Sequence, residues 1–287
     1  MSTAARSATH QESPGESQSP APARSITSSR GNTFAVYLGH LLRRTSRSTL
    51  IWTLAIAAYG ALIVAIYPSS KGTDLSAYPE ALRETFNMTS MDVVEPYLSA
   101  QIFSYLPLVL AFLPMTTFAA IAGAEERGAL DVLLGTPLPR RHLVITNFVS
   151  GAVNLLLIVI VLGGVLWLGG LGVDAELSLG EALAGALAVW PVALALGSVA
   201  LFLSAMVRQR SRALGLSIGV MFGMYALNVV SKLADRAAWL QYFSVFHYYG
   251  NAVQDGIFWV GTLALLGSSL MLAGAAIVMF ERRDVFA

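Results

Sequence analysis

The sequence predicts an all-α integral membrane protein with six transmembrane helices. Two features of composition lead to this fold class: 55% of the 287 residues are hydrophobic and 12% are charged. A soluble globular domain carries about 25% charged residues, roughly twice the fraction found here. The third observation is that the apolar residues gather in long runs, as expected for a chain surrounded by lipid.

Six apolar runs are long enough to cross a bilayer, since about 20 residues of helix span about 30 Å of hydrocarbon. None has Lys or Arg in its interior. The second and third runs exceed the minimum length, so we expect them to tilt or kink, with Pro107 and Pro114 as kink positions in the second. The runs are 49–67, 97–124, 143–171, 179–207, 213–230 and 257–280.

The N-terminal part before the first run divides into two segments. Residues 1–32 are rich in Ser, Pro, Ala, Gly and Gln, which predicts a disordered tail preceding a six-span domain at 33–287. In 33–47, apolar residues with helical spacing are followed by arginines, a pattern typical of an interfacial amphipathic helix or a simple membrane anchor. The residues concerned are Phe34, Tyr37, Leu38, Leu41, Leu42, Arg43, Arg44 and Arg47.

Basic residues indicate the orientation, because Lys and Arg are retained on the cytoplasmic side. The N-terminal tail, the second-to-third loop, the fourth-to-fifth loop and the C-terminus hold most of them. The opposite side has Lys71, Arg83, Lys232 and Arg236 and many acidic residues. We therefore expect a multi-pass protein of the bacterial inner membrane with both termini in the cytoplasm.

The loop after the second run has charge at both ends and leucines on one helical face between them. Gly135 and the prolines that follow it end the predicted helix. A short helix with one apolar face and charged ends suits docking to a cytoplasmic partner. The residues predicted to take part in this docking are Glu125, Glu126, Arg127, Gly128, Leu130, Asp131, Leu133, Leu134, Pro137, Arg140 and Arg141.

Residues 125–143 resemble the signature loop of permease subunits of ATP-binding cassette exporters of the second type (ABC-2). In that family an acidic pair, Arg-Gly, an apolar helix, Thr-Pro and paired Arg follow the second of six spans. The similarity extends over 33–287, including segments 67–69, 246–248 and 280–284. Size and layout are similar to those of permeases related to nitrous-oxide-reductase maturation and to antibiotic efflux.

The resemblance implies a division of labour between subunits. This chain has no Gly-x-x-x-x-Gly-Lys-Ser/Thr motif and is not expected to be an enzyme. ATP and Mg²⁺ would be bound by a separate ATPase, present in two copies with two permeases. The segment 125–141 would then be a coupling helix, with Leu130, Leu133 and Leu134 as its docking face and Glu126, Arg127 and Asp131 making polar contacts.

Polar and small residues inside the runs give weaker predictions. Gln101, Ser104, Tyr105, Thr116 and Thr117 would line a substrate pathway, suited by its low charge to an amphipathic or lipid-like molecule. Asn147, Asn154 and Asn228 need hydrogen-bond partners in hydrocarbon. Gly215, Gly219 and Gly223 form a ridge for close helix packing, either within the chain or, as the resemblance implies, between two permeases.

Other classes of function have little support in the sequence. The absence of cysteine excludes disulfides and a catalytic thiol. No two histidines have the spacing of metal ligands, so no metal site is expected. A net charge of +1 with scattered basic residues argues against nucleic-acid binding. Two alternatives to an exporter remain open: a maturation complex acting on a periplasmic or metal-handling partner, and a non-transporting scaffold or sensor.

Overall fold

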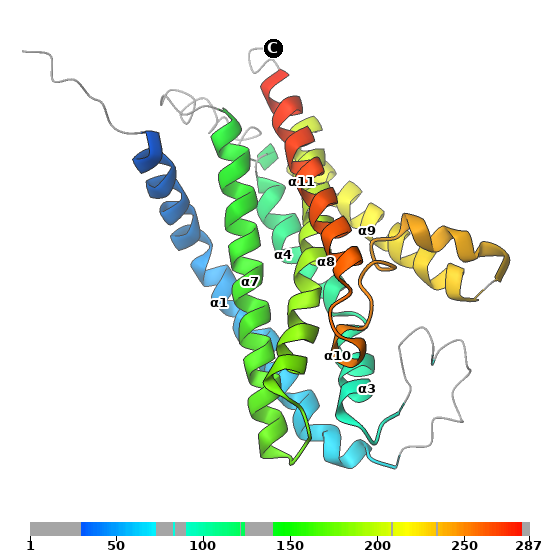
Figure 1. Cartoon of the computed structure of the whole chain (residues 1–287). Coiled ribbons are helices and arrows are strands. Elements are labelled where there is room, and N and C mark those ends of the chain that lie inside the picture. The colour runs from blue at the N-terminus through cyan, green and yellow to red at the C-terminus, as the bar shows by residue number, and fades with distance from the viewer. Residues whose placement is uncertain are drawn as a thin grey trace, which may run out of the picture.

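The computed structural model describes residues 30–72, 83, 90–120, 122–123, 140–207, 209–233 and 235–282, and all regular structure in them is helical (Figure 1). Five helices are long and apolar enough to cross a membrane, and a bent pair of shorter segments makes a sixth crossing if it is one span. The prediction of an all-α membrane protein is therefore confirmed, with five or six crossings in the described residues. The helices are α1 (Arg30–Ser70), α3 (Val94–Leu98), η2 (Ser99–Phe103), α4 (Leu106–Phe118), α7 (Arg140–Gly172), α8 (Leu179–Met206), α9 (Arg210–Leu233), η3 (Asp235–Phe243), α10 (Ala252–Asp255) and α11 (Trp259–Arg282).

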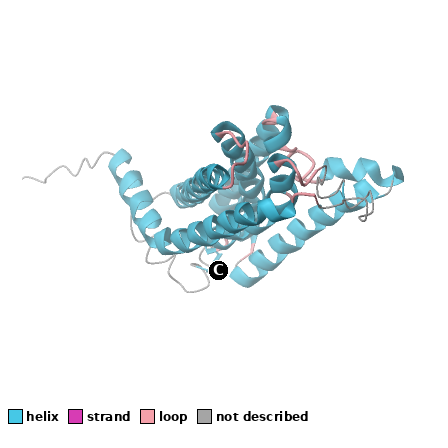
Figure 2. Ribbon diagram, turned by 90° about the horizontal axis from the view of Figure 1, so that it is seen from below, coloured by secondary structure: helices cyan, strands magenta, loops and turns pink. Residues whose placement is uncertain are grey.

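Helix α8 is the centre of the bundle, with α4, α7 and α11 packed around it (Figures 1 and 2). Its apolar window is 72% buried, compared with 28% for α11. The sequence of α8 is rich in Ala and Gly, which lets neighbouring helices approach closely. The Trp190 indole Nε1 donates to the Ala152 carbonyl of α7 at 2.9 Å, so its polar group is satisfied inside the bundle.

The second apolar run is broken near its start. The short π-helix η2 closes with a bond from the Ser104 amide to the Ser99 carbonyl at 3.0 Å, and the chain then bends by 40° before α4. Pro107 stands in the first turn of α4 and has no N–H, so it cannot bond the carbonyl of Phe103. The predicted kink lies beside Pro107, whereas α4 continues through Pro114.

The prediction of a separate interfacial helix is wrong, because α1 is one continuous helix from Arg30 to Ser70. No Gly or Pro interrupts residues 40–59. The Thr45 and Thr49 hydroxyls bond carbonyls one turn earlier, at 3.0 and 3.1 Å, and leave the ladder intact. Asn154 of α7 donates to Thr45 Oγ1 at 3.0 Å, so this part of α1 packs on α7. The side chains of Phe34 and Tyr37, and residues 1–29, lie outside the described residues.

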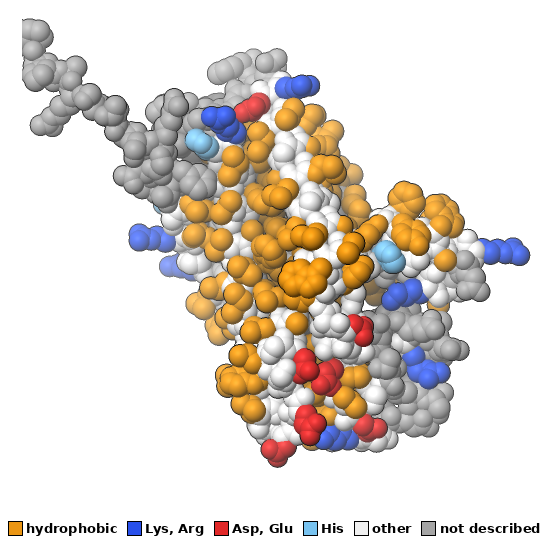
Figure 3. Space-filling view, viewed as in Figure 1, with side chains coloured by type: hydrophobic (Ala, Val, Ile, Leu, Met, Phe, Trp, Pro, Cys, Tyr) orange, Lys and Arg blue, Asp and Glu red, His pale blue; other side chains and the backbone are white. Residues whose placement is uncertain are grey.

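The two ends of the bundle differ in charge. Helix α1 begins and α11 ends at the same end (Figure 1). The α7–α8 loop, with Asp174 and Glu176, lies at the opposite end. Figure 3 shows acidic side chains gathered at that end and apolar side chains over the middle of the molecule. This distribution agrees with the acidic face expected from the sequence.

Helix α9 runs obliquely away from the bundle, and η3 folds back along it (Figures 1 and 2). The Ser244 hydroxyl donates to the Met224 carbonyl at 2.8 Å and ties the chain after η3 to α9. Ala213, Ser217 and Met221 of α9 are buried, on a face that packs against α8, whereas the glycine face is open: a Cβ built at Gly215, Gly219 or Gly223 would meet nothing within 4 Å. Among the described residues, the glycine ridge therefore makes no packing contact.

Helix α8 begins with a capping box, which gives a stability prediction. Ser178 Oγ accepts from the Glu181 amide at 3.2 Å, and the Glu181 carboxylate accepts from the Ser178 amide at 2.9 Å. Ser178→Ala is expected to cost about 1 kcal/mol of stability, because it removes one partner of the first helical amides. Thermal unfolding in detergent would measure this loss, with Ser178→Thr as the control that keeps the cap. Equal melting temperatures for the two variants would contradict the role of the cap.

Candidate functional site

Two tyrosines meet at the break in the second run. The Tyr59 hydroxyl of α1 lies 2.6 Å from the Tyr105 hydroxyl and 2.7 Å from the Gln101 carbonyl. Tyr105 also donates to this carbonyl. In a regular α-helix the Tyr105 amide would donate to the Gln101 carbonyl, but here it donates to the Ile102 carbonyl. The Gln101 carbonyl therefore accepts from the two tyrosine hydroxyls instead. The pair fixes α1 to the broken helix.

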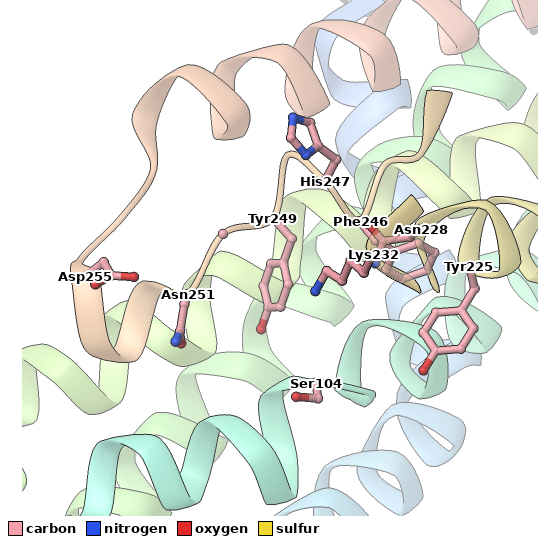
Figure 4. A pocket seen from close by; sticks show the side chains of 10 residues that line it. Ser104, Tyr225, Asn228, Lys232, Phe246, His247, Tyr249, Asn251 and Asp255 are labelled. Carbon is pink, nitrogen blue, oxygen red and sulfur yellow. The ribbon is translucent and has the colours of Figure 1, made fainter. Parts of the chain in front are cut away.

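A cavity of about 300 Å³ lies beside the same break (Figure 4). Three elements build it: the break itself, the last turns of α9, and the chain from the end of η3 to α10. Its volume is at the lower end of the range of about 300–1,000 Å³ found for small-molecule sites. The lining residues are Ser104, Tyr225, Asn228, Lys232, Phe246, His247, Tyr249, Gly250, Asn251 and Asp255.

The loop that closes the cavity is fastened to its neighbours. Ser99 in η2 donates to the Asn251 side-chain oxygen at 2.8 Å. The Tyr225 ring packs edge-on against Phe246, with centroids 5.5 Å apart. Gly250 has φ 68°, a conformation that favours glycine. These contacts hold the walls of the cavity in place.

The walls combine charge, hydrogen-bonding groups and aromatic rings. Lys232 and Asp255 are exposed at the rim, whereas Asn228 and Phe246 are buried. In Figure 4 the Lys232 ammonium lies beside the Tyr249 ring, whereas Asp255 lies on the far side of Asn251. Burial raises the pKa of the Tyr249 phenol, so this group stays protonated and can donate a hydrogen bond. The walls can therefore offer hydrogen bonds to a polar group.

The five residues predicted to line a substrate pathway fall in two places. Ser104 lines the cavity, Tyr105 is one of the two tyrosines beside it, and the Gln101 carbonyl accepts from both tyrosine hydroxyls. Thr116 and Thr117 lie at the other end of α4, where their hydroxyls donate to the Leu113 carbonyl at 3.0 and 2.9 Å. The structure thus brings three of the five to the break and leaves two elsewhere.

The three asparagines inside the predicted spans have different surroundings. Asn147 donates to the Leu143 carbonyl of its own helix at 2.8 Å, and Asn154 bonds Thr45 across a helix contact. Asn228 lines the cavity. Lys232, Tyr249, Asn251 and Asp255 were not predicted as site residues. They form no recognisable motif in the sequence and are brought to one cavity only by the fold.

The predicted coupling segment is largely outside the described residues. Arg140 begins α7, and the Arg141 side chain is exposed at that end of the helix. The other residues of the prediction are not among those described: Glu125, Glu126, Arg127, Gly128, Leu130, Asp131, Leu133, Leu134 and Pro137. The docking face remains a prediction from sequence.

Together, the helices and the cavity define a multi-pass α-helical membrane protein with a polar cavity beside the bend between η2 and α4. The chain belongs to the ABC-2 family of transporter proteins, whose match covers residues 41–285. The resemblance based on the 125–143 loop is thereby confirmed at the level of the family. A comparison with curated proteins gave no match.

Proposed function

We propose that this chain is the transmembrane subunit of an ABC exporter that moves an amphipathic or hydrophobic small molecule, such as a drug, an antibiotic or a lipid-like compound. The observation that carries the proposal is the polar cavity beside the break between η2 and α4. Polar groups are costly in a membrane bundle, so their concentration at one place marks a functional path. The aromatic walls and charged rim suit a molecule with one apolar and one polar part.

The working complex in this proposal has two permeases and two ATPase subunits, which bind ATP and Mg²⁺. Both termini lie in the cytoplasm of a bacterial cell and the acidic end of the bundle lies outside. The common end of α1 and α11, opposite the acidic end, supports this orientation (Figures 1 and 3). The cavity then lies toward the outer side, at the end of α9 that follows Asn228.

The proposal predicts that charge on the coupling segment uncouples the complex. In Leu130→Asp/Leu134→Asp, two carboxylates would enter an apolar docking contact, where an unpaired buried charge is strongly unfavourable. We expect at least a roughly tenfold loss of ATPase association, equivalent to about 1.4 kcal/mol. Co-purification with the candidate ATPase in mild detergent, followed by ATP turnover of the complex, would measure it.

The matched control is Val93→Asp, which adds a carboxylate at an exposed apolar position near the acidic end. It should leave association and turnover unchanged, because Val93 lies far along the chain from the coupling segment and before α3. If no ATPase associates with the wild type, or if the double variant retains normal coupling, the exporter proposal fails. The scaffold alternative would then be favoured.

A further inference from the structure

One face of α1 is apolar over much of its length and stays exposed in the described structure. Leu50, Ile51 and Leu54 are 58%, 68% and 61% exposed, and Leu62 and Ile66 continue the exposed surface towards the end of the helix. Large apolar side chains on the outside of a membrane protein face the lipid tails. This face therefore marks the side of α1 on which lipid lies.

Three arginines lie at the N-terminal end of the same face. With 3.6 residues per turn, Arg43, Arg44 and Arg47 fall with the three exposed residues at 50, 51 and 54 within an arc of about 120° around the helix axis. All three arginine side chains are exposed. Because α1 is one continuous helix, the arginines point to the side on which the lipid lies. Figure 3 shows basic side chains at the edge of the apolar surface on the side of α1.

The opposite face of α1 is occupied by the bundle, so the arginines cannot turn towards it. Thr49, Ile56 and Val64 are buried, and α1 packs on α7 along this side. The Asn154 side chain of α7 donates to the Thr45 hydroxyl at 3.0 Å, at the level of the arginines. The rotation of α1 about its own axis is thereby fixed.

The three arginines carry positive charge without an acidic neighbour on their helix, since α1 contains no Asp or Glu. A guanidinium group binds a phosphate with two parallel hydrogen bonds. Arg47 precedes Leu50 by three residues, about 4.5 Å of rise, so its side chain reaches the edge of the lipid tails. We propose that Arg43, Arg44 and Arg47, the α1 arginine cluster, bind the head group of an anionic phospholipid whose acyl chains lie along the exposed apolar face.

The charge of the cluster selects among lipids. A zwitterionic head group brings its own cation, which the arginines repel, whereas an anionic head group adds only attraction. Each basic residue near an anionic membrane surface strengthens binding about fivefold. The assignment of this lipid to the cytoplasmic leaflet rests on the orientation in the proposed function, but binding itself does not.

Other occupants suit the surface less well. Two permeases related by a two-fold axis along the membrane normal would hold their arginine clusters at the same depth, and a contact through this face would bring like charges together. A cytoplasmic ATPase could reach the arginines but not the apolar face that continues from them into the membrane. A lipid covers both parts at once.

The test is native mass spectrometry of the purified full-length chain in a non-ionic detergent, without any ATPase. The chain is titrated with dioleoyl phosphatidylglycerol or with dioleoyl phosphatidylcholine, which share their acyl chains and differ in head-group charge. We expect the first phosphatidylglycerol to bind at least about tenfold more tightly than the first phosphatidylcholine. Equal affinity for the two lipids would overturn the proposal.

A variant with two charges removed locates the lipid. Arg43→Gln/Arg47→Gln should weaken phosphatidylglycerol at least about tenfold and leave phosphatidylcholine unchanged. The matched control is Arg212→Gln/Arg282→Gln, which removes the same charge from exposed positions in the first turn of α9 and the last turn of α11. The control should bind phosphatidylglycerol like the wild type. If the two variants bind it equally, net charge rather than the cluster attracts the lipid, and the proposal is wrong.

The same variants reveal a protein occupant. If Arg43→Gln/Arg47→Gln separates paired chains in the mass spectra, or loses a co-purifying ATPase, while phosphatidylglycerol still binds as in the wild type, the cluster is a protein contact and the lipid proposal fails. The titration contains no ATPase, so its failure would leave the exporter proposal intact. Normal coupling in Leu130→Asp/Leu134→Asp would in turn leave the lipid result intact.

Discussion

Gly197→Leu is expected to remove most of the folded protein from a detergent extract. Gly197 lies on the central helix α8, where an added Cβ would be 2.6 Å from the Pro114 Cβ of α4 and 3.2 Å from the Phe118 ring. A proline ring cannot rotate away, and Phe118 is fully buried. Its ring also fills the space beside Gly151 of α7, so it has nowhere to move. The overpacking should cost roughly 3 kcal/mol.

Size-exclusion chromatography and thermal unfolding would measure the loss. Gly164→Leu is the matched control, because Gly164 is also helical and a Cβ there would meet nothing within 4 Å. Adding Phe118→Ala to Gly197→Leu should recover part of the folded fraction, since it frees the space that the leucine needs. A Gly197→Leu protein as stable as the control would show that α4 and α8 do not pack as described.

Much of the helical architecture follows from sequence because apolar length is a local property. The run predicted at 179–207 corresponds to α8 at Leu179–Met206, and the run at 143–171 lies within α7. Pro107 indicated the break in the second run for a physical reason, the missing N–H. These features needed no knowledge of which helix packs against which.

Features that depend on neighbours could not be predicted in this way. The apolar spacing and the arginines of 33–47 predicted a separate interfacial helix, but α1 is continuous through this segment, where Thr45 bonds the Leu41 carbonyl and accepts from Asn154. The departure of α9 from the bundle is also set by packing, through η3 and the Ser244 contact. Composition alone carries no information on either.

The residues of the candidate site could also be predicted only in part from the sequence. Ser104 was predicted because it is polar inside an apolar run. Lys232 and Asp255 lie at the ends of runs, where charge is ordinary, and only the fold places them at the rim of one cavity. Thr116 and Thr117 were equally polar, but their hydroxyls bond within α4 and they lie away from the cavity.

In the proposed complex of two permeases, Gly219→Leu is expected to separate the pair into single copies. The ridge Gly215, Gly219 and Gly223 is open along α9, and the large side chains of Leu216 and Phe222 near it are also exposed. A leucine side chain that faces lipid carries no free-energy penalty for exposure, because lipid tails are as apolar as leucine. Leucine also has a higher helix propensity than glycine. The variant should therefore fold, yet a second helix could no longer approach the ridge closely.

The effect should be at least a tenfold weaker association, since overpacking costs about 1–3 kcal/mol and both copies carry the substitution. Mass measurement by light scattering in detergent, over a range of protein concentrations, would detect it. Gly267→Leu on α11 is the control, because a Cβ there also meets nothing within 4 Å. If both variants remain paired like the wild type, the permeases meet through another surface. If the control also dissociates, lipid-facing bulk rather than the α9 ridge governs pairing.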